Sequence, residues 1–294
     1  MLYKSKSRTA FNIFNVSVLI FLTLLCILPL MNVVAISLSR QDAVMAGQVL
    51  FWPVDFTTIA YRTILREALL IRTLTNSFIR LAVGVPINMI LIVICAYPLS
   101  KPKGRLMFRQ FYVWFFVITM LVNGGLIPTF LVIRSYGLLN SFWALILPSA
   151  MQVFNMILML NFFRSLPMEL EEAALIDGAG HTRVLVSIYL PCSRAAIATI
   201  TLFCIVFHWN EWFTAQIYLN RIDMYPLQSY LQLLLTQAQS VVNLSPSEME
   251  EVARINARTF NAAQIVISTI PILLVYPFLQ RYFVTGLTLG SVKG

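Results

Sequence analysis

A chain of 294 residues in which 59% are hydrophobic and only 11% are charged is too apolar for a soluble globular domain. Recurrent apolar runs of about twenty residues or more indicate a helical protein that crosses a membrane several times. The net charge of +9 does not indicate a nucleic-acid-binding protein, because the basic residues are scattered at the ends of the apolar runs. The four cysteines lie in or beside these runs and show neither metal-ligand spacing nor a disulfide framework.

The apolar runs predict an all-α, polytopic membrane protein in which residues 1–294 form one transmembrane domain. Lys4, Lys6 and Arg8 precede the first run, and no small-residue cleavage site follows it, so this run is expected to remain as a span. A possible amphipathic helix lies around residues 61–72. Six spans are predicted, at 11–36, 76–99, 108–133, 141–163, 195–219 and 260–283.

The distribution of Lys and Arg predicts the orientation of these spans. With the N-terminus inside, the short cytoplasmic segments hold 12 of the 21 basic residues, whereas most of the others lie in two long outer connections that count little in this rule. Both termini and the loop 164–194 are therefore expected in the cytoplasm.

Residues 166–191 form a polar interruption between two strongly apolar runs. They hold four of the chain's 12 carboxylates, namely Glu169, Glu171, Glu172 and Asp177. The pattern predicts a helix, a break at Gly178 and Gly180, and a second helix that Thr182 caps and that ends near Pro191. The glycines are not followed by the glycine and lysine of a phosphate loop, so any ATPase that energises transport must be a separate subunit.

A second polar group lies inside the fifth predicted span, at Trp209, Asn210, Glu211 and Trp212. Tryptophan offers a face on which a sugar ring stacks, and the neighbouring amide and carboxylate can bind hydroxyl groups. An interfacial aromatic belt with a buried structural glutamate explains the same residues equally well. His208, just before this group, is interpreted as a packing residue.

Other polar residues interrupt the spans, and three of them, Asn123, Gln152 and Asn155, are candidates for a polar translocation path. Hydrogen bonding between helices is the alternative for each of them. Arg80 and Arg134, near the outer side, could favour an acidic oligosaccharide such as an alginate or pectin fragment, although arginines are common at membrane interfaces. Only two histidines exist, so no histidine-rich metal site is possible, and no catalytic constellation is apparent.

The acidic segment resembles the signature of the permease subunits of bacterial ABC importers, which reads EAA, three residues, Gly, nine residues, then I-x-LP. Here the signature corresponds to Glu172-Ala173-Ala174, Gly178 and Ile188-Tyr189-Leu190-Pro191. The C-terminal stretch from Gln280 to Gly294, the stretch 137–148, residues 123–128 and the Trp209–Trp212 group are similar to the maltose-transporter group of carbohydrate permeases, in its oligosaccharide branch.

This resemblance implies the six-helix fold of type I ABC importer permeases in a bacterial inner membrane. It implies a heteromer with a second homologous permease, two ABC ATPase subunits that hold ATP and Mg, and an extracytoplasmic solute-binding protein. No cofactor or metal is expected on this chain. Alternating access, driven by ATPase closure on paired coupling helices, is the implied mechanism. The residues expected at the ATPase are Glu169, Glu172, Ala173, Ala174, Asp177, Gly178, Ile188, Leu190, Pro191, Lys293 and Gly294.

Three other classes of membrane protein are alternatives to an oligosaccharide permease. An ABC permease for another solute, such as a polyamine or phosphate, disagrees with the C-terminal tail and the Trp209–Trp212 group. An intramembrane enzyme would need a catalytic constellation that the spans do not show, and an ion channel would conduct without an ATPase partner. For Lys293 and Gly294, a frayed terminus remains an alternative to an ATPase contact.

Overall fold

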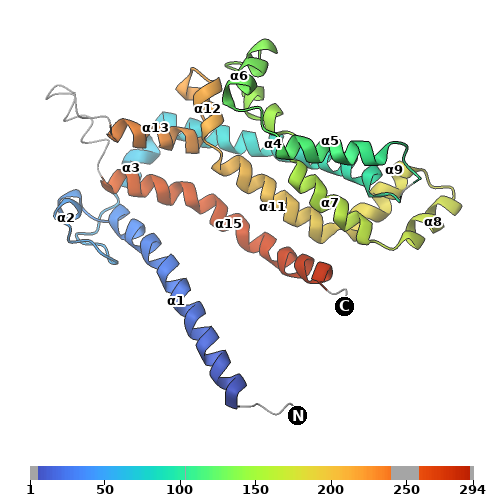
Figure 1. Ribbon diagram of the computed structural model, residues 1–294. Coiled ribbons are helices and arrows are strands. Elements are labelled where there is room, and N and C mark those ends of the chain that lie inside the picture. Colours follow the sequence, from blue (N-terminus) through green and yellow to red (C-terminus); the bar gives the residue numbers. More distant parts are fainter. Residues whose placement is uncertain (1–5, 103, 240–257, 292–294) are drawn as a thin grey trace. The chain divides into compact units, whose positions relative to one another are not determined.

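The computed structural model describes residues 6–102, 104–239 and 258–291 of the chain (Figure 1). Within these ranges every regular element is a helix, which confirms the all-α class. The chain falls into two compact units, one of residues 1–68 and 233–270 and the other of residues 69–232 and 271–294.

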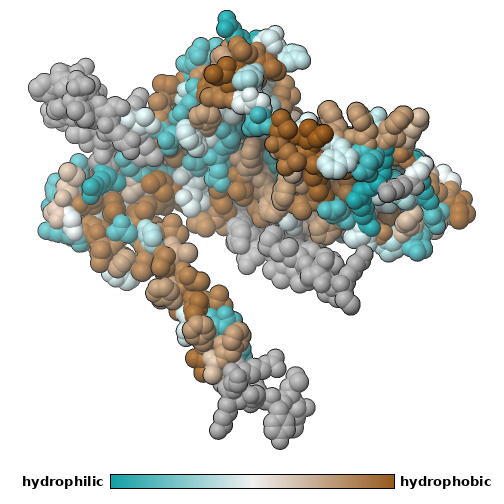
Figure 2. Space-filling model, in the orientation of Figure 1, coloured by the Kyte–Doolittle hydropathy of each residue, from teal (hydrophilic) through white to brown (hydrophobic). Residues whose placement is uncertain are grey.

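Among the described residues, two helices are long and apolar enough to cross a membrane unaided. They are α1 (Lys6–Ser37) and α4 (Ala68–Ser100), whose apolar stretches of 28 and 33 residues contain the first two predicted spans. At roughly 1.5 Å per residue, either stretch exceeds a hydrocarbon core of about 30 Å. Side chains on α1 are largely exposed, and its visible face in Figure 2 is hydrophobic along most of its length, as expected for a helix bordered by lipid or another chain.

The third and fourth predicted spans are broken helices. Helices α5 (Arg109–Leu121) and α6 (Leu126–Ser135) meet at 115°, since Gly125 between them adopts a left-handed φ of 86°. The fourth span consists of η1 (Phe142–Leu145) and η2 (Leu147–Ser149), which meet α7 (Val153–Ser165) at 46°. A further bend of 84° lies just before the fifth predicted span. It joins α9 (His181–Val184), η3 (Leu185–Tyr189) and α10 (Leu190–Cys192) to α11 (Arg194–Asn210). If each pair is one span, the described residues hold up to five spans by length and composition.

The shorter elements occupy the connections. The predicted amphipathic helix at 61–72 is divided, because α3 (Ile59–Arg66) ends before Glu67 and residues from Ala68 onward belong to α4. Helix α15 (Arg258–Ser291) contains the sixth predicted span. The remaining elements are α2 (Gln41–Met45), α8 (Met168–Ile176), α12 (Phe213–Tyr218), η4 (Ile222–Met224) and α13 (Leu227–Gln239).

The core of the second unit lies between α4, α5, α7 and α11. Ile92 and Ala96 of α4, Met159 of α7 and Ile200 of α11 are among its fully buried side chains. Helices α8 and α9 lie at one end of this bundle, and α6 and α12 lie at the other (Figure 1). Both polar groups predicted to carry function therefore belong to this unit, at its two ends.

A close approach of α4 to α11 occurs at Gly84. A Cβ atom built on Gly84 would lie 2.8 Å from the Nε2 atom of His208, which is closer than real Cβ contacts allow. We predict that Gly84→Ala lowers the free energy of unfolding by about 1–3 kcal/mol, because the imidazole must move. Thermal unfolding of the solubilised complex measures this effect.

Gly124→Ala is the matched control, since its Cβ would meet only Pro128 at an ordinary contact distance of 3.9 Å. A Gly84→Ala protein as stable as the control would contradict the close packing of α4 on α11.

Candidate functional site

The acidic segment folds as the sequence predicts, as a helix, a break and a second helix. Helix α8 begins after Pro167 with two glutamates in its first turn, where the helix dipole favours negative charge. It ends at Ile176, and Gly178, which follows the C-cap residue Asp177, has a left-handed φ of 80° that suits a residue without a side chain. The predicted cap at Thr182 is wrong: α9 starts at His181 after Gly180, so Thr182 lies inside the helix.

The residues predicted to face an ATPase separate into two sets in the structure. Ala174, Ile188 and Leu190 are half-buried and pack against the core of the bundle. Lys293 and Gly294 lie outside the described residues. The side chains or backbone of the others are exposed: Glu169, Glu172, Ala173, Asp177, Gly178 and Pro191.

The sequence predicts an ATPase contact for Glu172 and gives its neighbour Glu171 no role, but the structure gives Glu171 a separate, buried position. Glu171 is 1% exposed, and its Oε2 atom accepts hydrogen bonds of 2.7 Å from the Lys101 ammonium and from the Tyr189 hydroxyl. Arg105 lies 3.5 Å from its other oxygen and also donates to the exposed Glu172 at 2.9 Å. The position of Glu171 on the helix could have indicated its burial. Residues three and four positions apart lie on the same face of a helix, and Ala174 and Leu175, which follow Glu171 at these distances, are apolar and half-buried.

The environment of Glu171 keeps its carboxyl group ionised. Burial opposes ionisation, but the hydrogen bonds from Lys101 and Tyr189 and the positive charges of Lys101 and Arg105 outweigh it, so the pKa of Glu171 lies below its ordinary value of 4.5. The acidic segment is thus attached by a buried ion pair to residue 101, which directly follows α4.

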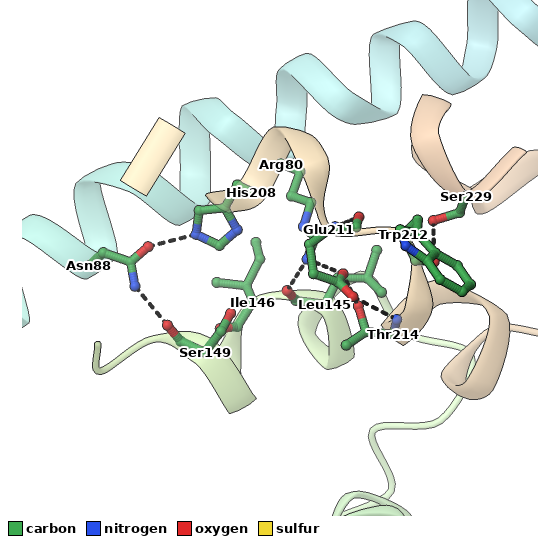
Figure 3. Close-up of polar contacts among 10 residues, drawn as sticks. All are labelled: Arg80, Asn88, Leu145, Ile146, Ser149, His208, Glu211, Trp212, Thr214 and Ser229. Atoms are coloured by element: carbon green, nitrogen blue, oxygen red, sulfur yellow. Dashed lines mark hydrogen bonds and ion pairs between the residues drawn. The ribbon is translucent and has the colours of Figure 1, made fainter. Parts of the chain in front are cut away.

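At the other end of the bundle, the Trp209–Trp212 group lies where α11 ends and α12 begins (Figure 3). The Arg80 side chain of α4 is 1% exposed and donates to the Glu211 carboxylate at 2.8 Å. It also donates to the backbone oxygens of Glu211 at 3.0 Å and Leu145 at 3.2 Å. The Glu211 carboxylate accepts further hydrogen bonds from the Thr214 backbone N–H and hydroxyl. Its oxygens are therefore occupied by the protein itself.

A second contact between α4 and α11 lies beside this pair. The Asn88 amide donates to the backbone oxygens of Ser149 and Ala150 at 2.8 and 2.7 Å, and its Oδ1 atom lies 2.6 Å from the Nε2 atom of His208 (Figure 3). Asn88 thereby satisfies carbonyl groups at the bend between η2 and α7. This geometry agrees with the interpretation of His208 as a packing residue.

The other residues predicted for a substrate path are not brought into one site. Trp209 is buried against Phe78, with ring centroids 5.7 Å apart, whereas Asn210 and Trp212 are exposed. Asn123 is exposed at the α5–α6 break, where its side chain accepts from the Gly125 N–H.

Gln152 and Asn155 form a separate polar group with Cys204. The Asn155 amide donates to the Gln152 Oε1 atom, and the Cys204 sulfur lies 3.6 Å from the same amide nitrogen. The Nε2 atom of Gln152 is buried and has no hydrogen-bond partner among the described residues. Gln152 is therefore the member of this group with unused hydrogen-bonding capacity. No cluster of three or more His, Cys, Asp or Glu residues that could hold a metal occurs in the described ranges.

The fold and the acidic segment define a transport component, and residues 59–288 match the family described as binding-protein-dependent transport system inner membrane component. The chain belongs to this family, which consists of permease subunits of ABC importers. The family match confirms the resemblance to ABC importer permeases and excludes the alternative that the chain is an intramembrane enzyme.

Individual relatives narrow the comparison. The chain is 41% identical to the polygalacturonan/rhamnogalacturonan transport system permease protein YtcP of Bacillus subtilis (strain 168), over 94% of this chain and 96% of YtcP. It is 36% identical to protein LplC of the same organism, over 100% of this chain and 98% of LplC. A chain in the crystal structure of a bacterial ABC transporter involved in the import of the acidic polysaccharide alginate superposes with a TM-score of 0.86 at 34% identity, covering 96% of this chain and 100% of that chain.

The contacts of Glu211 predict an asymmetric mutational response. Arg80→Met leaves the partly buried carboxylate without its cation and should lower the free energy of unfolding by about 3–5 kcal/mol. The double variant Arg80→Met/Glu211→Gln keeps the side chain's capacity to accept from Thr214 and should recover most of the loss. Thermal unfolding of the solubilised complex compares the two, and a double variant less stable than Arg80→Met alone would contradict the pairing.

Proposed function

We propose that this chain is one of two permeases in an importer of acidic oligosaccharides, with ATP hydrolysis on separate subunits. The acidic segment is the observation that carries this proposal. It combines the complete EAA–Gly–I-x-LP spacing with an exposed face that includes Glu172, Ala173 and Asp177. A flat alanine surface flanked by carboxylates can dock in a socket that offers basic groups or a helix N-terminus.

The proposed topology has six spans, with both termini and the loop 164–194 in the cytoplasm. The up to five spans in the described residues are compatible with it, with α15 as the sixth. The proposed partners are a second homologous permease, two ABC ATPases that bind ATP and Mg, and an extracytoplasmic binding protein that delivers the sugar. This chain itself binds no cofactor in the proposal.

Relatives support an acidic substrate class. YtcP is named for polygalacturonan and rhamnogalacturonan, and the structural relative imports alginate, so both transport polymers that contain uronic acids. Arg80 cannot serve as a free cation for such a substrate, because it is buried and paired with Glu211. Arg134, at the end of α6, is exposed and is the better candidate of the two arginines.

We assign the exposed Asn210 and Trp212 to the sugar path, with Gln152 and Asn155 as further candidates. Glu211, which binds Arg80, is assigned the structural role of stabilising the break between α11 and α12. An exposed indole beside an amide offers a stacking face and hydroxyl partners. Asn123, at the α5–α6 break, joins the path in the same proposal.

Uptake by the reconstituted complex tests the substrate class. Proteoliposomes that contain both permeases, the ATPases and the binding protein should accumulate oligogalacturonates or alginate oligosaccharides in the presence of ATP, and neutral maltodextrins of equal length should not compete. Uptake of a polyamine or of phosphate, without uptake of any oligosaccharide, would overturn the proposal.

Gly178→Asp tests the coupling role of the segment. An aspartate at a left-handed φ of 80° is strained and should displace α9 from α8, so sugar-stimulated ATP hydrolysis should be lost. Membrane insertion should be retained, because Gly178 lies outside the predicted spans. Normal stimulation of ATP hydrolysis in this variant would contradict the role given to the segment.

A further inference from the structure

Helix α4 is held by a buried ion pair toward each of its ends. Arg80 binds Glu211 at 2.8 Å, and Lys101, directly after the last residue of α4, binds Glu171 at 2.7 Å. The two cations are 21 positions apart, which corresponds to roughly 32 Å along a helix. Each partner carboxylate lies on a segment that the sequence singled out for function.

The contact at Lys101 joins three segments of the chain. The Lys101 ammonium lies 3.8 Å from the centre of the Tyr97 ring and 4.1 Å from that of the Tyr189 ring, so it is enclosed by aromatic faces as well as by Glu171. Tyr97, Phe163 and Tyr189 pack edge to face, with centroids between 5.0 and 6.5 Å apart. Glu171 of α8, Tyr189 of η3 and the end of α4 thus form one buried joint.

Adjacent glutamates of α8 consequently have different roles. Glu172 is exposed on the face available to a partner, whereas Glu171 points into the bundle with its side chain 2% exposed. A buried carboxylate deprived of its cation is strongly destabilising, so α8 cannot separate from the end of α4 without a large free-energy cost. When α8 is pushed at its exposed face, the end of α4 is therefore expected to move together with it.

We propose that Glu171 is a positioning residue that fixes the acidic segment to α4 and so transmits movement of the segment to the polar break at Glu211. The inference rests on the proposed coupling function of the segment. The Lys101–Glu171 pair connects α8 to the end of α4, whereas Glu172 lies on the exposed face of α8 that is proposed to contact the ATPase.

The test separates coupling from assembly. Glu171→Gln and Lys101→Met are introduced into the full reconstituted complex, and sugar transported per ATP hydrolysed is measured together with the amount of assembled complex. Glu171→Gln should assemble and hydrolyse ATP, whereas Lys101→Met, which leaves Glu171 buried without its closest cation, should give less assembled complex. In both variants the ratio measured per assembled complex should fall by about tenfold, within the range typical of coupling between sites. The double variant should be no worse than either single variant, since the two residues act as one unit.

Arg194→Met is the matched control for Lys101→Met, because Arg194 is an exposed cation at the start of α11 and belongs to neither the buried joint nor the surface proposed to contact the ATPase. It should keep the wild-type ratio. A wild-type ratio in Glu171→Gln, or a loss that only follows the amount of assembled complex, would overturn the positioning role. If Gly178→Asp still abolishes stimulation in that case, the proposed function stands and only the joint is refuted; if Gly178→Asp is also normal, the proposed function fails.

Discussion

A buried cation requires an anion beside it, and two cations are buried along this part of the chain, Arg80 within α4 and Lys101 directly after its last residue. The Arg80–Glu211 and Lys101–Glu171 pairs determine which elements must contact α4 at each end of the bundle. Between them, Asn88 binds carbonyl groups at the η2–α7 bend and faces His208 of α11. Helix α4 therefore connects the acidic segment, the α7 bend and the α11–α12 break within one unit.

This arrangement changes how the polar residues near the α11–α12 break are understood. Glu211 is occupied by Arg80 and Thr214, so its carboxylate serves the architecture of the break. The neighbouring Asn210 and Trp212 remain exposed and available to a ligand. The Arg80–Glu211 ion pair therefore holds the break at which Trp212 is exposed. Polar residues of this group can thus have a structural role without contacting a ligand.

Hydropathy and local helix signals were sufficient for much of the fold and for the helices of the acidic segment. Long apolar runs predicted α1 and α4, and the glutamates and glycines of the acidic segment predicted the helix–break–helix that includes Gly178. Composition could not predict the bends, because a 115° turn at the α5–α6 break depends on local φ angles as well as on overall hydropathy.

Long-range pairing was also hidden in the sequence. Arg80 and Glu211 are 131 positions apart, and Lys101 and Glu171 are 70 apart, so no local pattern relates them. Glu171 and Glu172 are chemically identical neighbours, and only helical phase assigns one to the core and the other to the surface. The sequence therefore predicted the helices of the segment but not which of its glutamates is buried.

Proximity between the acidic segment and the ATPase is the most direct test of the account. A photoreactive cross-linker can be attached to Glu172→Cys in a background in which the exposed Cys26 and Cys192 are replaced by serine, with Phe111→Cys on the exposed face of α5 as the control. The account predicts that position 172 cross-links to the ATPase subunit, with a yield that changes on ATP binding, and that position 111 does not. Absence of any cross-link from position 172 in an assembled, ATP-hydrolysing complex would contradict it.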